Sequence, residues 1–328
     1  MVNSVEIKRL SVKNFIKYFS CAHSMLISLA DKHQLTVDVS FLKAATGFGA
    51  GVSTMGDVCG MVNGGAMLLG KKLYPLFANS EEQWKIAFYS NEFYNRTKNT
   101  LGTCNCGDVH GGKHLAKNFR KAILTGRSMK CFEMLYKGSG ILEDLFGRNE
   151  LEHFGVDSVR KEAIRDIYQH FQSSQFHCCK STLQKIEELN GLDTSVLNDS
   201  IDCFIGGIGF SGTLCGAVVG GVLAIGLKDG VNPHERDYKD TVKIFYQGLL
   251  KNDKVWSNEK VFKAAKTFDK CQALYKMVEE TYGSCDCSAI SSLDVDKPCG
   301  LQKFKEKRGI HQCQQLSENI AQKVNLLL

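Results

Sequence analysis

Proline and tryptophan are scarce in this chain of 328 residues, and no segment has low complexity. The three prolines argue against long disordered linkers. Hydrophobic residues make up 43% of the sequence and charged residues 23%, as is typical of soluble globular proteins. The net charge of +6 comes from scattered basic residues and not from a basic patch, so we expect no nucleic-acid partner.

A secretory signal is also missing. Residues 1–10 are polar and charged, and no small-residue cleavage site follows an apolar run. We therefore expect a cytoplasmic protein, in which structural disulfides are disfavoured. The fourteen cysteines then need another explanation: a metal, an iron–sulfur cluster, redox thiols or plain burial.

Long apolar runs are rare. The uncharged stretch 210–227 has the 18 residues that a membrane helix needs at minimum, but five of them are glycine. The matching stretch of the first half contains Asp57, Asn63 and Lys71. We therefore predict a buried helix packed through its glycines and no membrane span.

Alternation of apolar and polar residues over strand lengths is hard to find. Apolar residues recur instead at helical spacing, as at Val12, Phe15, Ile16 and Phe19. We predict an all-α fold with glycine-rich breaks between the helices.

Cysteine is abundant, and its pattern occurs twice. The run CGMVNGG from Cys59 recurs as CGAVVGG from Cys215, and GTCNC recurs as GSCDC. Each half has a further cysteine upstream and another downstream. The candidate site residues are therefore Cys21, Cys59, Cys104, Cys106 and Cys131 in the first half, and Cys179 (or Cys178), Cys215, Cys285, Cys287 and Cys313 in the second. Sulfur spaced so regularly indicates thiolates gathered at one site per half.

The repeat predicts a tandem duplication with two homologous helical domains, residues 1–149 and 150–328. Each would be a helical bundle around a glycine-rich central helix that starts at the CG motif. The interval from Cys215 to Cys287 is about 25 residues longer than the matching interval of the first half.

Glycines inside the central helices cost ~1 kcal/mol each relative to alanine, so close packing has to offset them. The glycine-rich loops before these helices follow no strand and carry no P-loop Lys-Ser/Thr pair, so a nucleotide site is not indicated. Cys59 and Cys215 in the first helical turn would feel the positive end of the helix dipole, which lowers a thiol pKa and favours the thiolate.

Some cysteines and the histidines do not repeat. Cys203 and Cys271 fall in apolar helical stretches and are interpreted as structural, whereas Cys299 follows a proline in a loop. His110 and His114 have no counterpart near the second CxC pair, so we interpret them as solvated or supporting residues. The sequence contains no CxxCH motif, which excludes c-type haem attachment through it.

The order of these motifs resembles the C_GCAxxG_C_C family of redox-active proteins, small domains with four characteristic cysteines. Related domains occur in split-Soret cytochromes, which carry an iron–sulfur cluster beside their haems. The motif is intact from Cys215, and Met61 replaces its alanine in the first half. The resemblance implies metal ligands at Cys21, Cys59, Cys106 and Cys131, and at Cys179 (or Cys178), Cys215, Cys287 and Cys313. The haem-linked role is not implied, because the haem motifs are missing.

Three functions remain open. An iron–sulfur protein would hold a [2Fe–2S] or [4Fe–4S] cluster in each repeat and act in electron transfer or, at a cluster with an open position, as an oxidoreductase. A cluster-free thiol–disulfide protein would use the CxC and CG cysteines. A structural zinc site is the third alternative. Either redox function implies a redox partner protein, and the sequence permits a homodimer.

Overall fold

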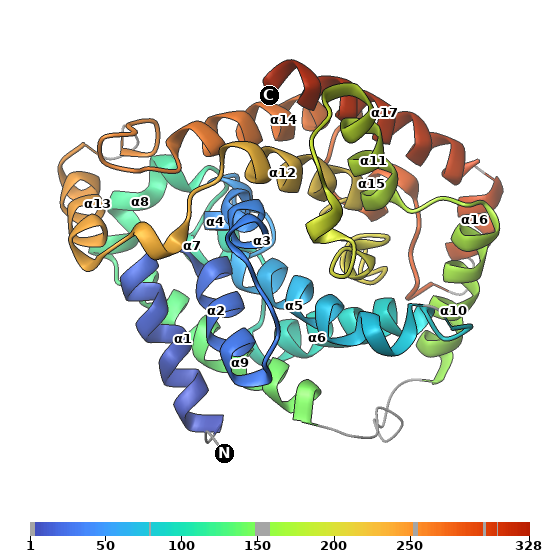
Figure 1. Ribbon diagram of the computed structural model, residues 1–328, viewed down its shortest axis with the longest axis horizontal. Coiled ribbons are helices and arrows are strands. Elements are labelled where there is room, and N and C mark those ends of the chain that lie inside the picture. Colours follow the sequence, from blue (N-terminus) through green and yellow to red (C-terminus); the bar gives the residue numbers. More distant parts are fainter. Residues whose placement is uncertain (1–3, 79, 148–157, 252–254, 298–299, 307) are drawn as a thin grey trace. The chain divides into compact units, whose positions relative to one another are not determined.

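The computed structural model of the chain is helical and describes residues 4–78, 80–147, 158–251, 255–297, 300–306 and 308–328. Over these residues there is no β-strand, only two isolated β-bridges, which confirms the predicted all-α fold (Figure 1). The chain divides into two compact units, which are described one at a time. Unit 1 comprises residues 1–65, 96–143 and 225–273, and unit 2 comprises residues 66–95, 144–224 and 274–328.

Unit 1 contains the N-terminal helices, the first CxC segment and a helical segment of the second repeat. In it, α1 lies beside α2 and α13, and α13 also packs against α8 (Figure 1). Its elements are α1 (Ser4–Tyr18), α2 (Cys21–His33), α3 (Val39–Ala44), η1 (Ala45–Phe48), α4 (Gly49–Val52), the start of α5 (Gly60–Phe77), the end of α6 (Trp84–Leu101), α7 (Cys106–His110), α8 (Leu115–Leu124), η2 (Arg127–Met129), most of α9 (Lys130–Gly147), the end of α12 (Gly216–Asp229), η5 (Pro233–Glu235), α13 (Tyr238–Lys251) and the start of α14 (Ala265–Tyr282).

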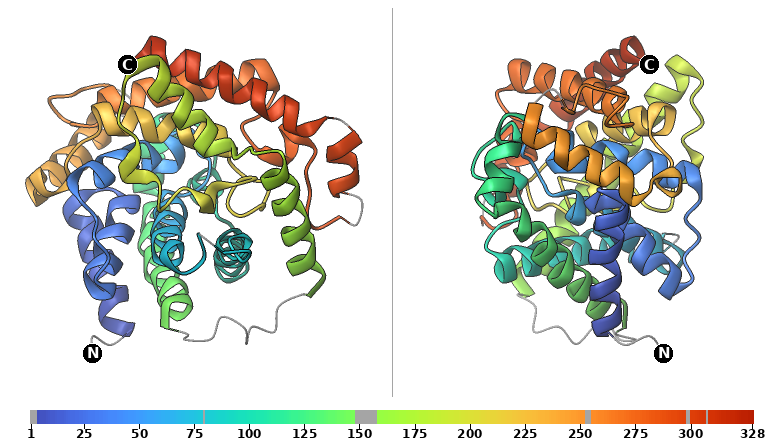
Figure 2. Two further views of the ribbon diagram at one scale, coloured as in Figure 1. Left: turned by 45° about the vertical axis from the view of Figure 1, so that its right-hand side comes forward. Right: turned by 90° about the vertical axis from the view of Figure 1, so that its left-hand side faces the viewer.

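Unit 2 has the second CxC segment and the C-terminal helix. In it, α11 and α17 run side by side (Figure 2). Its elements are the end of α5, most of α6, α10 (Ser158–Ser173), α11 (Cys178–Asn190), η3 (Ser195–Leu197), η4 (Asp202–Phe204), most of α12, the end of α14, α15 (Cys287–Ser291), α16 (Gly300–Glu306) and α17 (Gly309–Leu327).

The compact units do not follow the predicted domain boundary at residue 149. Residues 66–95 of the first repeat belong to unit 2, and residues 225–273 of the second repeat belong to unit 1. The junction itself, residues 148–157, lies outside the described residues. The boundary therefore stays a prediction about the duplicated sequence, while the packing units draw on both repeats.

The uncharged stretch 210–227 forms α12 and the loop that precedes it. None of the helices in the described ranges has the length and hydrophobicity needed to cross a membrane.

The first glycine of each central helix admits a neighbouring cysteine at close range. In unit 1, a Cβ on Gly60 would lie 2.8 Å from the Sγ of Cys21. In unit 2, a Cβ on Gly216 would lie closer than 3.0 Å to the Sγ of Cys178. Real Cβ atoms do not approach other atoms so closely, so both positions require glycine. This is the close packing that the glycine pattern predicts.

Candidate functional site

An antiparallel backbone contact holds two cysteines of unit 1 side by side. The N–H of Cys59 donates to the carbonyl of Cys104 (2.7 Å), and the N–H of Cys106 donates to the carbonyl of Asp57 (3.0 Å). The two bonds flank an isolated β-bridge between the CxC segment and the residues before α5. Cys59, directly before α5, and Cys106, at the start of α7, are thereby fixed as neighbours.

Unit 2 repeats this contact. The N–H of Cys215 donates to the carbonyl of Cys285 (2.8 Å), and the N–H of Cys287 donates to the carbonyl of Thr213 (2.7 Å). The second isolated β-bridge lies between these bonds. The CxC segment therefore has the same structural task in both units, which is to bring its second cysteine to the start of a central helix.

A third cysteine in each unit comes from the first residue of a helix. Cys21 begins α2, which is capped by the hydroxyl of Ser20. Cys178 begins α11, where Nδ1 of His177 accepts a hydrogen bond from the N–H of Lys180 (3.2 Å). A side chain that caps the helix N-terminus fixes where the helix begins, and hence where the cysteine lies.

The four sulfurs of unit 1 form one group. The thiol of Cys59 is hydrogen-bonded to the thiols of Cys21 and Cys106. Cys131, near the start of α9, is close enough to raise the pKa of Cys59 and Cys106. Its Sγ lies 3.3 Å from Nε2 of His110. All five residues line one cavity of unit 1.

Four sulfurs also come together in unit 2. Burial is the main reason that the pKa values of Cys287 and Cys313 are raised, and the nearby thiols of Cys215 and Cys178 raise both further; Cys313 also raises that of Cys287. The four cysteines per half that the resemblance implies as metal ligands thus lie near one another, with one choice made between adjacent residues, whereas the candidates Cys104 and Cys285 are placed differently.

That choice is Cys178 and not Cys179. Cys178 starts α11 as Cys21 starts α2, and its sulfur lies against Gly216 as that of Cys21 lies against Gly60. Cys179 is one position further along the helix and fully buried. The structure therefore assigns the place equivalent to Cys21 to Cys178.

Burial keeps the thiols of both groups protonated. It raises the pKa of Cys131 and of Cys178 to about 12. The hydrogen bond between Cys59 and Cys106 raises the pKa of Cys59 well above its ordinary value. Burial raises the pKa of Cys215, although N–H groups at the start of α12 lower it. The expectation that the helix end favours thiolates at Cys59 and Cys215 is therefore wrong, because desolvation and thiol hydrogen bonds outweigh the helix terminus.

The first cysteine of each CxC pair does not join the group of sulfurs. The thiol of Cys285 donates to the carbonyl of Tyr275 on α14 (3.4 Å). Burial raises the pKa of Cys104 to about 12, and the nearby charge of Lys98 partly lowers it. No other cysteine contributes to this pKa shift. Their backbone carbonyls, which bind the N–H groups of Cys59 and Cys215, serve the site.

Two of the cysteines interpreted as structural are buried outside the groups. The thiol of Cys203 donates to the carbonyl of Ser200 (2.9 Å), and Cys271 is hydrogen-bonded to Ser53. Cys299 lies outside the described residues.

His110 is one of the two histidines that the sequence indicates only as solvated or supporting residues, and the structure places it beside Cys131. It follows Cys106 by one helical turn in α7 and reaches Cys131, and burial lowers its pKa. The corresponding position of α15, one turn after Cys287, holds Ser291. The i, i+4 spacing from Cys106 is the signal that the sequence offers for this contact, although His110 has no counterpart in the second half.

The donor set suits an iron–sulfur cluster, because four cysteine sulfurs are the ligands such clusters use. Within the described ranges, however, no group of three or more His, Cys, Asp or Glu side chains has the geometry to hold a metal ion. The cysteines of the described residues are free thiols and form no disulfide. The residues fit a cluster in kind and in number, while their thiols are arranged as a buried, hydrogen-bonded group.

Comparison with known proteins gives one match. The family model described as "Putative redox-active protein (C_GCAxxG_C_C)" matches residues 19–145 and again residues 176–327. No curated protein and no solved structure matches the chain. The two matched regions contain the two sets of four cysteines and confirm the tandem duplication.

Proposed function

Since the chain belongs to the C_GCAxxG_C_C family, whose description is redox-active, we propose that it is a redox protein that binds one iron–sulfur cluster in each unit. A bound cluster would supply one-electron transfer at a potential that the surrounding protein tunes. The ligands in this proposal are Cys21, Cys59, Cys106 and Cys131 in unit 1, and Cys178, Cys215, Cys287 and Cys313 in unit 2.

One observation carries the proposal: in each unit, four cysteines from four separate segments bring their sulfurs together. Random burial of small hydrophobic residues does not produce the same four-sulfur group twice. The same pair of backbone hydrogen bonds supports the group each time.

Backbone N–H groups around the sulfurs would stabilise negative charge on them. N–H groups of Ala50 and Gly60 bond to the sulfurs of Cys21 and Cys106. In unit 2, the N–H of Gly206 bonds to the sulfur of Cys178. Such bonds lower the pKa of a thiol and, in cluster proteins, raise the reduction potential. The glycine-rich loops thus have a role without any nucleotide.

Ligation requires that the buried thiols lose their protons. A thiol whose pKa is about 12 keeps its proton at neutral pH, so metal binding must displace it. Cluster incorporation should therefore release protons and become more favourable as pH rises.

Thiol–disulfide chemistry is the second candidate, and the hydrogen-bonded thiols of Cys21, Cys59 and Cys106 favour it. Oxidation of two adjacent thiols to a disulfide would release two electrons and two protons to a disulfide or quinone acceptor. The raised pKa values weigh against it, because the attacking species is the thiolate.

The deciding experiment is anaerobic purification with iron and sulfide analysis and a visible spectrum. We expect a brown protein whose absorbance bleaches with dithionite. Colourless, metal-free protein with reversible thiol titration would support the second candidate, and zinc alone would support a structural zinc site.

Cys59→Ser and Cys215→Ser assign the sites. Each should lower the iron content by about half, because each removes a ligand from one of two clusters. Cys271→Ser and Cys203→Ser are matched controls, one in each unit, and should retain the iron. Unchanged iron in both ligand variants would overturn the assignment.

A further inference from the structure

The cysteines of unit 1 border a cavity of about 300 Å³, which we call the aromatic chamber. Its lining includes Phe15, Phe19, Phe119, Phe245, Trp256 and Phe262. Met129 also lines it and is exposed, so the chamber reaches the surface of unit 1. This volume is in the range of small-molecule sites.

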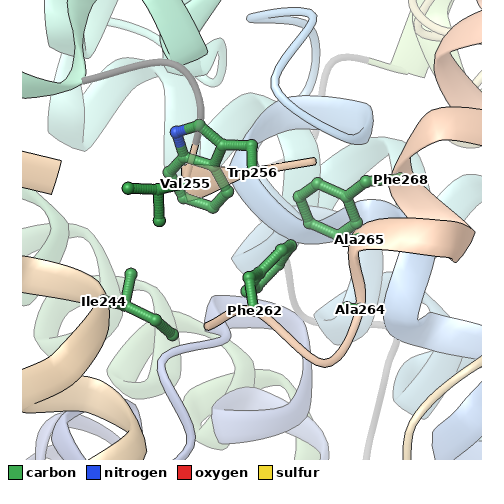
Figure 3. Close-up of a cluster of buried hydrophobic side chains, with 7 residues drawn as sticks. All are labelled: Ile244, Val255, Trp256, Phe262, Ala264, Ala265 and Phe268. Atoms are coloured by element: carbon green, nitrogen blue, oxygen red, sulfur yellow. The ribbon is translucent and has the colours of Figure 1, made fainter. Parts of the chain in front are cut away.

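One wall of the chamber comes from the segment that lengthens the second repeat. The extra residues between Cys215 and Cys287 include α13, which packs against α1 and α8 of unit 1. Figure 3 shows the apolar cluster that Ile244 of α13 forms with residues after that helix, with Trp256, Phe262 and Phe268 close together. Trp256 and Phe268 are stacked with ring centroids 6.0 Å apart. The insertion thus contributes stacked aromatic rings to the cavity wall beside the cysteines of the first repeat.

A buried cation also lines the chamber. Arg236 is only 6% exposed, and its guanidinium donates one hydrogen bond to the carbonyl of Tyr18 (2.9 Å) and lies over the ring of Phe262. No carboxylate of the described residues forms an ion pair with Arg236. Burial lowers the pKa of Arg236, and Asp240, which attracts its charge only from a longer distance, partly offsets this. A buried guanidinium with spare donors favours an anionic partner.

Two further polar atoms of the lining have no hydrogen-bond partner. Nε2 of His23 lies 2.7 Å from the carbonyl of Leu42, which can only accept, so Nε2 carries the proton and Nδ1 is left as an acceptor. This Nδ1 and the indole N–H of Trp256 are both buried and unpaired among the described residues. Buried polar atoms are nearly always hydrogen-bonded, so unpaired ones in a cavity wall point to a ligand or ordered water.

From these features we propose that the aromatic chamber binds a planar aromatic molecule with an anionic oxygen substituent, such as an aromatic carboxylate. The rings of Trp256 and its neighbours provide the apolar faces, and Arg236 provides the charge for the carboxylate. The bound molecule lies beside Cys21, Cys59, Cys106 and Cys131. Binding does not require a cluster, so this inference goes beyond the proposed redox function and is tested separately.

The test uses the intrinsic fluorescence of Trp256. The chain has two tryptophans, so Trp84→Phe leaves Trp256 as the sole emitter. Titration with trans-cinnamate should change its emission saturably, and the neutral isostere cinnamamide should bind about tenfold more weakly, because it forgoes the charge-assisted bond. Absence of a saturable change with cinnamate, or equal affinity for both compounds, would overturn the proposal.

Arg236→Gln in this background should abolish the preference for cinnamate, and Arg165→Gln, an exposed arginine of unit 2, should leave it intact. Arg236 is buried, so circular dichroism must show that the variant folds. If it does not fold, the ratio of the two affinities in the protein with Arg236 still decides the question. The iron analysis and the titration are read separately. A protein that is purified without iron and binds cinnamate keeps the chamber although the cluster proposal fails, and a protein that contains iron and does not bind cinnamate does the reverse.

Discussion

In unit 1 the sulfur of Cys131 lies 3.3 Å from His110 and borders the aromatic chamber. In unit 2 the position that corresponds to His110 holds Ser291, whose hydroxyl donates to the backbone carbonyl of Cys287 (2.7 Å). The backbone bonds that position the cysteines are the same in both units. The duplication has thus kept the scaffold of four sulfurs and changed the groups around it. The imidazole of His110 can take up a proton, whereas the hydroxyl of Ser291, which also lies 3.7 Å from the sulfur of Cys287, cannot.

The two groups also differ in access. Cys131 is half-buried and lies in a cavity that reaches the surface, whereas Cys313, its counterpart, is buried. A site that is reached from outside suits reaction with a small molecule, and a closed site suits storage or transfer of electrons. The comparison therefore points to unit 1 as the reactive site of the pair.

The largest effect should come from the part that both units share. Gly60→Ala and Gly216→Ala place a Cβ against the Sγ of Cys21 and of Cys178, two of the proposed ligands, so each should lower the free energy of unfolding by about 1–3 kcal/mol and lower the iron content. Chemical denaturation and iron analysis measure both quantities. Gly147→Ala is the control, because no atom lies within 4 Å of its added Cβ and alanine favours a helix. If Gly60→Ala and Gly216→Ala are both as stable as the control, the close packing of these glycines against Cys21 and Cys178 is not required.

The next effect tests the difference in access. In iron-free protein, the alkylation rate of Cys131 by iodoacetamide should rise about tenfold per pH unit through the alkaline range below its pKa. The sign follows from the pKa of about 12, raised by burial above the ordinary 9.0, because only the thiolate reacts. Cys313 should react more slowly at every pH, since it is less exposed and its pKa is also raised. Mass spectrometry of the labelled peptides separates the two residues; equal rates would remove the proposed difference.

Much of the scaffold could be predicted from the sequence. The helical spacing of apolar residues at Val12, Phe15 and Ile16 indicates the helix that becomes α1, although that helix ends at Tyr18 and Phe19 lies beyond it. The lack of strand alternation agrees with the lack of strands in the described residues. The CGxxxGG and CxC motifs point to the two groups because each motif is short and occurs once in each half in the same order. Glycine at positions 60 and 216 correctly indicates close packing, since little else offsets its cost in a helix.

The remaining features depend on contacts between distant segments. Cys178 and Cys179 are adjacent in sequence, and only the packing of α11 against Gly216 distinguishes them. The thiolate prediction counted the helix terminus but not burial, which depends on the whole unit. The aromatic chamber was not predicted, because α13 belongs to one repeat in sequence and packs in the unit that contains the cysteines of the other.

The smallest effect should come from the first cysteine of each CxC pair. Cys104→Ser and Cys285→Ser should leave the iron content unchanged and alter the free energy of unfolding by about 1 kcal/mol or less, because the backbone carbonyl that holds the partner cysteine is retained. At Cys285 the serine hydroxyl can also take over the hydrogen bond to the carbonyl of Tyr275. Cys106→Ser, only two residues from Cys104, is the matched contrast and should remove the iron of unit 1. Equal iron loss in Cys104→Ser and Cys106→Ser would mean that both sulfurs bind the cluster, and the shared scaffold would then have five ligands in place of four.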